Sequence, residues 1–111
     1  MESIVEKTLL YDFYGALLTE HQRTLYADVT FNDMSLSEAA EVYGISRQGV
    51  HDLLKRCDAA LRDYEEKLKL IAQYENEKKL TSEMRALLSS EEPDKDGLLS
   101  LLEKLEHEIE R

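Results

Sequence analysis

The residues from Ser35 to Arg56, SLSEAAEVYGISRQGVHDLLKR, carry two signals for the start of a helix, separated by a glycine. Ser35 and Glu38 have the spacing of a capping box, in which a hydroxyl and a carboxylate satisfy backbone amides. Gly44 fits the end of that first helix, because glycine adopts a positive φ at low cost. Ser46 is a favoured N-cap residue for a second helix. Two capped helices around a glycine turn predict a helix-turn-helix unit.

The apolar residues of this unit recur at the three- and four-residue spacing of amphipathic helices. They are Leu36, Ala39, Ala40 and Tyr43 on the first helix, and Val50, Leu53, Leu54 and Cys57 on the second. The two small residues of the first helix leave room for another helix to cross closely. Both stripes would then face one core, which leaves the opposite side of the second helix to solvent.

That solvent-facing side carries the candidate contacts to nucleic acid. The candidate DNA-binding residues are Ser46, Arg47, Gln48, His51, Lys55 and Arg56. Arginine can bond guanine and glutamine can bond adenine in bidentate fashion, and the first turns of such a helix enter the major groove. Lys55 and Arg56 come later on the helix and are better placed for phosphates. The alternative interpretation is a plain helical hairpin whose polar side chains are only solvated.

The same stretch resembles the promoter-reading C-terminal domain of bacterial sigma factors, which has a similar S-x-x-E-x-A-x-x-x-G-I-S-R pattern. Together with the preceding LTEHQRTLYADVTFNDM, roughly residues 1 to 80 are similar to the YlxM family. Those are small helix-turn-helix proteins of Gram-positive bacteria, usually encoded beside the signal recognition particle protein. The resemblance implies a regulatory or accessory role in the signal recognition particle pathway, with that particle's protein or its receptor as a partner.

The remaining sequence predicts further helices and an all-α fold. One proline, four glycines and abundant Leu, Ala, Glu and Lys favour helix. Thr19 and Gln22 have the spacing of another capping box, for a helix over about residues 20 to 29. We expect Tyr11 and Tyr14 to anchor a core rather than stack on bases. They flank an apolar stripe made of Ile4, Val5, Leu9, Phe13 and Leu17.

The second helix of this unit would be its recognition helix, and its apolar pattern continues past Arg56. Its positions step by three and four residues through Val50, Leu54, Cys57, Leu61, Tyr64, Leu68 and Ile71. Because no Gly or Pro interrupts residues 50–92, we expect one long helix that continues to Tyr74 or Lys79. A new helix capped by Thr81 or Ser82 would follow. The predicted domains are therefore a helix-turn-helix domain at 1–79 and a C-terminal helical appendage at 80–111.

A second amphipathic helix follows the linker at residues 89–97, which holds the only proline. Its apolar positions are Leu98, Leu101, Leu102, Leu105 and Ile109, and Asp96 is its predicted cap. This helix either folds back on the chain or forms an acidic docking helix for a partner. The apolar faces of the long helix and the C-terminal helices also favour a homodimer that would cover them.

The charge balance argues against strong DNA binding. The chain has 14 Lys and Arg against 24 Asp and Glu, a net charge of −10. Neither side of Lys79 is basic, with 10 basic and 15 acidic residues up to it and 4 and 9 beyond it. Only the segment 46–57, with three basic residues and one acidic, reaches +2. This pattern favours weak, salt-sensitive DNA binding, or a protein-interaction module that docks the signal recognition particle protein or its receptor without DNA.

Several kinds of chemistry lack a sequence signal. We find no phosphate-binding glycine loop, no Cys or His cluster and no Ser-His-Asp set, so we expect neither an enzyme nor a metal or cofactor site. Cys57 is the only cysteine, which suits a reducing, cytoplasmic environment. No run of about 18 apolar residues predicts a membrane span, and the N-terminus lacks the features of a signal peptide.

Overall fold

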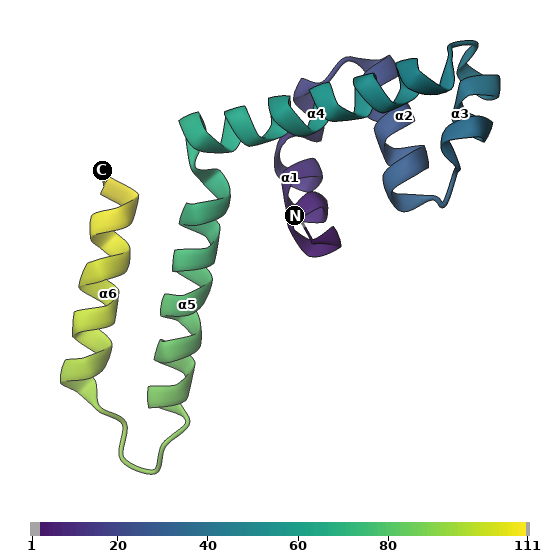
Figure 1. Cartoon of the computed structure of the whole chain (residues 1–111). Helices are drawn as coiled ribbons and strands as arrows, with labels where there is room; N and C mark the ends of the chain where they lie inside the picture. The colour runs from purple at the N-terminus through teal and green to yellow at the C-terminus, as the bar shows by residue number, and fades with distance from the viewer. Residues whose placement is uncertain (1–2, 111) are drawn as a thin grey trace. The chain divides into compact units, whose positions relative to one another are not determined.

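The computed structural model describes residues 3–110, and every regular element in that range is a helix. Residues 1, 2 and 111 lie outside the described part. The chain forms two compact units, Met1–Lys69 and Leu70–Arg111. The first unit contains α1 (Ile4–Tyr14), a short 3₁₀ turn η1 (Gly15–Leu17), α2 (Glu20–Phe31), α3 (Leu36–Tyr43) and α4 (Arg47–Leu68). The second contains α5 (Leu70–Leu88) and α6 (Lys95–Glu110) (Figure 1). The predicted all-α class is confirmed.

The core beneath the helix-turn-helix unit is built from one fully buried residue on each of three helices. These are Leu25 on α2, Ala39 on α3 and Val50 on α4. The small side chain of Ala39 lets α4 approach α3 closely. The surrounding partly buried residues are Val29, Met34, Leu36, Ala40, Tyr43, Ile45, Leu53 and Leu54. The inward faces predicted for both helices of the unit are therefore confirmed.

The buried face of α1 differs from the predicted stripe by about one residue. Leu10 and Tyr14 are buried, whereas Ile4 and Val5 are 56% and 65% exposed. Tyr14 can enter the core because its hydroxyl donates a hydrogen bond to Glu65 of α4, at 2.5 Å. The tyrosine acts as a core anchor, as expected, but it belongs to the buried stripe rather than to its flank.

The recognition helix ends earlier than the sequence indicated. We expected it to continue to Tyr74 or Lys79, but α4 ends at Leu68. Lys69 adopts left-handed backbone angles, φ 55° and ψ 30°, and its amide donates to the carbonyl of Glu65 at 2.8 Å. Glycine usually occupies this C-cap position. Because lysine gives no such signal, the break was not visible in the sequence.

The C-terminal unit is an antiparallel helical hairpin in which α6 folds back along α5 (Figure 1). Thr81 and Ser82 lie inside α5 and do not start a new helix, so that prediction is wrong. The cap of α6 is also shifted from the predicted Asp96, since Asp94 accepts a hydrogen bond from the Gly97 amide at 3.0 Å. In the part of the chain that is described, no helix is long and apolar enough to cross a lipid bilayer.

Candidate nucleic-acid interface

The turn between α3 and α4 is fixed by the capping groups that the sequence indicated. The Ser35 hydroxyl accepts a hydrogen bond from the Glu38 amide at 3.0 Å and thereby caps α3. Gly44 ends α3 with φ 67° and ψ 34°, in the left-handed region. The Ser46 hydroxyl then accepts from the Gly49 amide at 2.9 Å and caps α4. Together these bonds set the direction in which the recognition helix leaves the turn.

The first turns of α4 bring three candidate residues together at the surface. Arg47, Gln48 and His51 are exposed, and with Leu36 of α3 they line an open hollow of about 380 Å³. On the adjoining side of the helix, Val50 is completely buried. The hollow therefore has an apolar wall and a rim of hydrogen-bonding groups, the combination that a base edge requires.

The other three candidate residues lie around this hollow and not within it. Lys55 follows His51 by four residues, so it lies on the same side of α4 one turn later. Arg56 is exposed on the flank of that side. Ser46 already uses its hydroxyl oxygen as a cap acceptor, but a hydroxyl can donate a hydrogen bond at the same time.

Asp52 is a member of this surface that the sequence reasoning did not select. Its Oδ1 accepts a hydrogen bond from Nε2 of Gln48 at 2.9 Å and lies 3.8 Å from Nδ1 of His51. The carboxylate therefore orients the glutamine and places a negative charge on the recognition face. The four-residue spacing of Gln48 and Asp52 on one helix was the signal that could have identified it.

Two tyrosine hydroxyls hold the helix-turn-helix against α2. Tyr26 of α2 donates to Asp58 of α4 at 2.8 Å, and Tyr43 of α3 donates to Asp28 of α2 at 2.6 Å. Burial, followed by the hydrogen bond to Asp58, raises the pKa of Tyr26 well above its ordinary value. The hydrogen bond to Asp28 is the main cause that raises the pKa of Tyr43. Both tyrosines therefore remain protonated donors at neutral pH.

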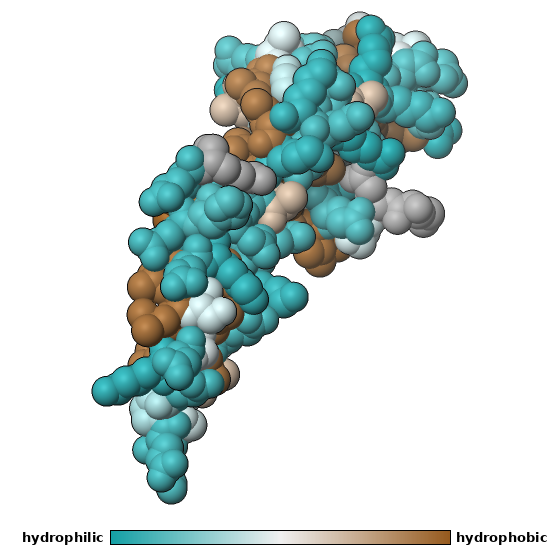
Figure 2. All heavy atoms as spheres, turned by 90° about the vertical axis from the view of Figure 1, so that its left-hand side faces the viewer, coloured by the Kyte–Doolittle hydropathy of each residue, from teal (hydrophilic) through white to brown (hydrophobic). Residues whose placement is uncertain are grey.

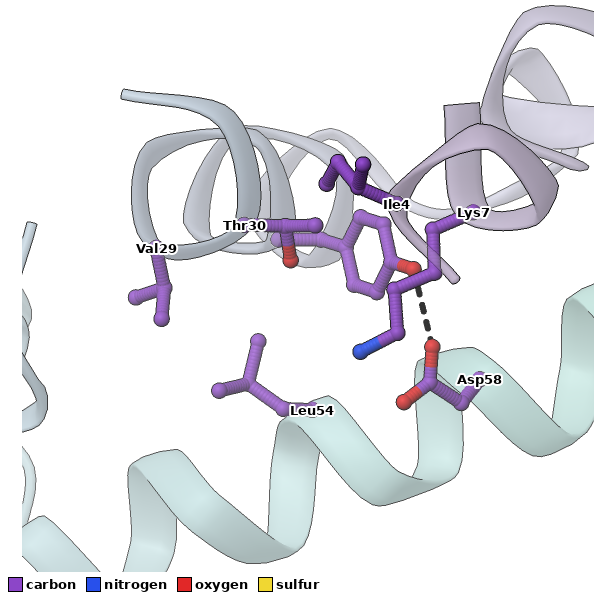
Figure 3. Close-up of a pocket in the computed structure, with 7 residues that line it drawn as sticks. Ile4, Lys7, Val29, Thr30, Leu54 and Asp58 are labelled. Atoms are coloured by element: carbon purple, nitrogen blue, oxygen red, sulfur yellow. Dashed lines mark hydrogen bonds between the residues drawn. The ribbon is translucent and has the colours of Figure 1, made fainter. Parts of the chain in front are cut away.

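A second open hollow, also of about 380 Å³, lies between α1, α2 and α4 (Figure 3). It is lined by Ile4, Lys7, Tyr26, Val29, Thr30, Leu54 and Asp58. Figure 3 shows the Tyr26–Asp58 hydrogen bond at one side and the aliphatic side chains of Val29 and Leu54 at the other. None of the candidate DNA contacts lines it, so this hollow is separate from the recognition surface.

Within residues 3–110, no three His, Cys, Asp or Glu side chains group in a way that could hold a metal ion. Cys57 is completely buried on α4, and burial is the main cause that raises the pKa of its thiol to about 11. The thiol is therefore protonated at neutral pH and packs as a small apolar group.

Two capped helices crossing at a left-handed glycine, with a polar surface on the first turns of the second helix, define a helix-turn-helix protein. Residues 1–104 match the family described as "Putative helix-turn-helix protein, YlxM / p13 like". The chain belongs to this family. The resemblance that the sequence suggested is thus confirmed.

Relatives of the same kind occur in several Bacillus species. UPF0122 proteins of Bacillus cereus, Bacillus anthracis and Bacillus thuringiensis are each 36% identical to this chain over 106 residues. The aligned region covers 96% of this chain and 96% of each relative. The similarity therefore extends over both compact units.

Proposed function

We propose that the chain is a DNA-binding regulatory protein that places the first turns of α4 in the major groove. The observation that supports this most strongly is the exposed group of Arg47, Gln48 and His51 around the hollow beside Leu36. A recognition helix reads base edges with residues at these positions. The family description as a helix-turn-helix protein is consistent with this proposal.

Each polar group has a distinct role in the proposed complex. Arg47 offers two parallel donors to guanine, and the wall formed by Leu36 can receive the methyl group of thymine. Asp52 holds one amide hydrogen of Gln48, which leaves the Gln48 carbonyl oxygen and the second amide hydrogen for a base edge. Ser46, Lys55 and Arg56 would contact phosphates and so set register rather than sequence.

Only the first half of α4 is electrostatically suited to contact a phosphate backbone. Its first turn contains no acidic residue, so the positive end of the helix dipole is not offset there. The whole chain carries −10, which opposes DNA at longer range. The proposal is therefore one of weak binding with marked salt dependence.

The proposal assigns DNA reading to a helix-turn-helix domain and association to a C-terminal helical appendage, with the compact units meeting at residues 69 and 70. It includes a homodimer, since two copies would present two recognition helices to adjacent major grooves. It also places the protein in the cytoplasm, as its single buried cysteine suggests.

The net charge of −10 favours a second candidate function. In this alternative, the same scaffold is an accessory module of the signal recognition particle pathway. It would dock the protein of that particle or its receptor and would not bind DNA. The two functions differ in whether a nucleic acid occupies the surface of Arg47 and His51.

A titration of fluorescent duplexes from the gene's upstream region, at about 50 and 200 mM salt, distinguishes them. If Lys55 and Arg56 neutralise two phosphates, affinity should fall roughly tenfold over that range. A preferred duplex should also resist competition by unrelated DNA. Absence of binding at the lower salt would contradict the DNA function, and the signal recognition particle protein with its RNA would be titrated next.

A further inference from the structure

The residues buried between α5 and α6, which we call the seam, show which side of each helix faces the other. Leu80 of α5 and Leu101 of α6 are buried, with 5% and 7% of their surface exposed. The Asn76 side chain donates a hydrogen bond to Glu108 across the two helices. The seam that faces the opposite helix consists of these two leucines and of partly buried residues at helical spacing from them, which are Glu77, Met84, Leu87, Leu98, Leu105 and Glu108.

The residue after each seam position lies 100° further round its helix. Because α5 and α6 run in opposite directions, this rotation leads to the same side of the hairpin for both helices. All residues that fall there are exposed, and we call this side the hairpin face. It comprises Lys78, Thr81, Arg85 and Leu88 from α5 and Leu99, Leu102, Glu106 and Ile109 from α6.

The hairpin face is rich in large apolar side chains that remain in contact with solvent. Leu88, Leu99, Leu102 and Ile109 are 60%, 56%, 45% and 66% exposed. Figure 2 shows hydrophobic side chains gathered on the hairpin, in the lower half of the view. The other side of the hairpin is polar, where a hollow is lined by Asn76, Leu80, Lys104, His107 and Glu108. Only one side of this unit is therefore suited to burial.

We infer that the hairpin face pairs with the hairpin face of a second copy, so that the two hairpins form an antiparallel four-helix bundle. This deepens the homodimer of the proposed function by naming the surface that forms it. A two-helix unit of this length buries too little apolar area to be stable by itself, and oligomerisation is a usual remedy. Four helices that pack their apolar faces around one core form a four-helix bundle, which is a common fold.

The charges on the hairpin face favour a second copy and also select its orientation. The α5 half carries the cations Lys78 and Arg85, and the α6 half carries the anion Glu106. A two-fold axis parallel to the helices places each α5 against the α6 of the other copy. The hydrogen bond between Asn76 and Glu108 puts Lys78 level with Glu106 in the antiparallel hairpin, so Lys78 approaches Glu106 of the other copy. Pairing α5 with α5 would instead bring like charges together. The face is thus complementary to itself in one arrangement.

Sedimentation equilibrium of the full chain without DNA tests this pairing. We expect a dimer at micromolar concentration, and we expect Leu102→Asp to weaken its dissociation constant at least tenfold, because the carboxylate would be buried without a partner. The matched control is Ser100→Asp, which adds the same charge to an exposed position on the polar side of α6. A monomeric parent, or equal effects of both variants, would overturn the inference.

A charge exchange provides a second test that a folding defect cannot imitate. Lys78→Glu and Glu106→Lys should each weaken the dimer several-fold, and the double variant should restore it. If the double variant is weaker than both single variants, the proposed orientation is wrong. Because no DNA is present, a failure here leaves the DNA function untouched. A dimer that does not bind duplex would contradict only the proposed function.

Discussion

Tyr26 on α2 donates its hydroxyl hydrogen to the carboxylate of Asp58 on α4 at 2.8 Å. Asp58 lies about three turns beyond Arg47, so the bond fixes the middle of the recognition helix rather than its exposed start. The tyrosine is 1% exposed, and its ring stacks on Tyr11 with the centroids 5.9 Å apart. Through its buried ring and this hydrogen bond, Tyr26 therefore helps to fix the orientation of α4 relative to the core.

Removing this donor should destabilise the first unit. Tyr26→Phe leaves the partly buried Asp58 carboxylate without the tyrosine donor, and we expect a loss of about 1–2 kcal/mol in the free energy of unfolding. Urea denaturation measures it. The matched control is Tyr11→Phe, because Tyr11 contacts Tyr26 and Phe31 through its ring. Equal losses in the two variants would show that the hydrogen bond to Asp58 contributes little.

The buried thiol of Cys57 predicts a loss of stability at alkaline pH. Its pKa rises from an ordinary 9.0 to about 11 in the folded chain. Above pH 9 the unfolded thiol loses its proton while the folded thiol keeps it, so stability falls as pH rises towards 11. The slope reaches at most about 1.4 kcal/mol per pH unit.

Thermal unfolding of the parent and of Cys57→Ala between pH 9 and 10 measures this contribution. The range stops at pH 10 because the raised pKa of Tyr26 adds a similar loss above its ordinary value of 10.0. The variant should lose less stability over this range than the parent does. Parallel pH profiles would mean that the thiol does not contribute.

Gly44 should tolerate substitution poorly despite the open space around it. A Cβ at this position would have no heavy atom within 4 Å, so its cost comes from the positive φ of 67° alone. We expect Gly44→Ala to cost about 1–2 kcal/mol and Gly44→Asn to cost less, because asparagine visits left-handed angles more readily. Chemical denaturation of both variants checks the order. An alanine variant as stable as the parent would contradict the strained turn.

Asp52 should restrain DNA binding while it orients Gln48. Asp52→Asn keeps an acceptor for the glutamine but removes a negative charge from the recognition face. We expect affinity for any duplex to rise by up to about fivefold at low salt, a gain that salt should screen. Asp52→Ala removes the acceptor as well, and it should also reduce the preference between duplexes. Unchanged affinity in both variants would place Asp52 outside the interface.

The helix-turn-helix could be predicted from the sequence because its signals are local. The hydroxyls of Ser35 and Ser46 and the freedom of Gly44 act within three or four residues of their own positions. The spacing of apolar residues on α3 and α4 likewise indicated which sides would be buried. Propensity, capping and hydrophobic pattern agree there, which is the condition for a reliable prediction.

The errors arose where the deciding partner is remote in the chain. Leu9 and Leu10 are equally apolar, and the buried stripe of α1 depends on the bond from Tyr14 to Glu65, 51 residues away. Lys69 ends α4 with left-handed backbone angles that lysine rarely adopts, so the residue type at this position gave no signal of a helix end. Asp52 is a different case, because its partner Gln48 is only four residues away and their spacing on one helix was a usable signal that the prediction did not apply.

The most direct test of the central claim compares Arg47→Ala with Lys67→Ala in the same duplex titration. Both changes remove one cation from α4, but Lys67 lies about 30 Å further along the helix, in an exposed ion pair with Asp63. The measured quantity is the ratio of affinities for a preferred and an unrelated duplex. We predict that Arg47→Ala lowers this ratio at least tenfold and that Lys67→Ala leaves it unchanged. Equal ratios in the two variants would contradict base reading by the first turns of α4.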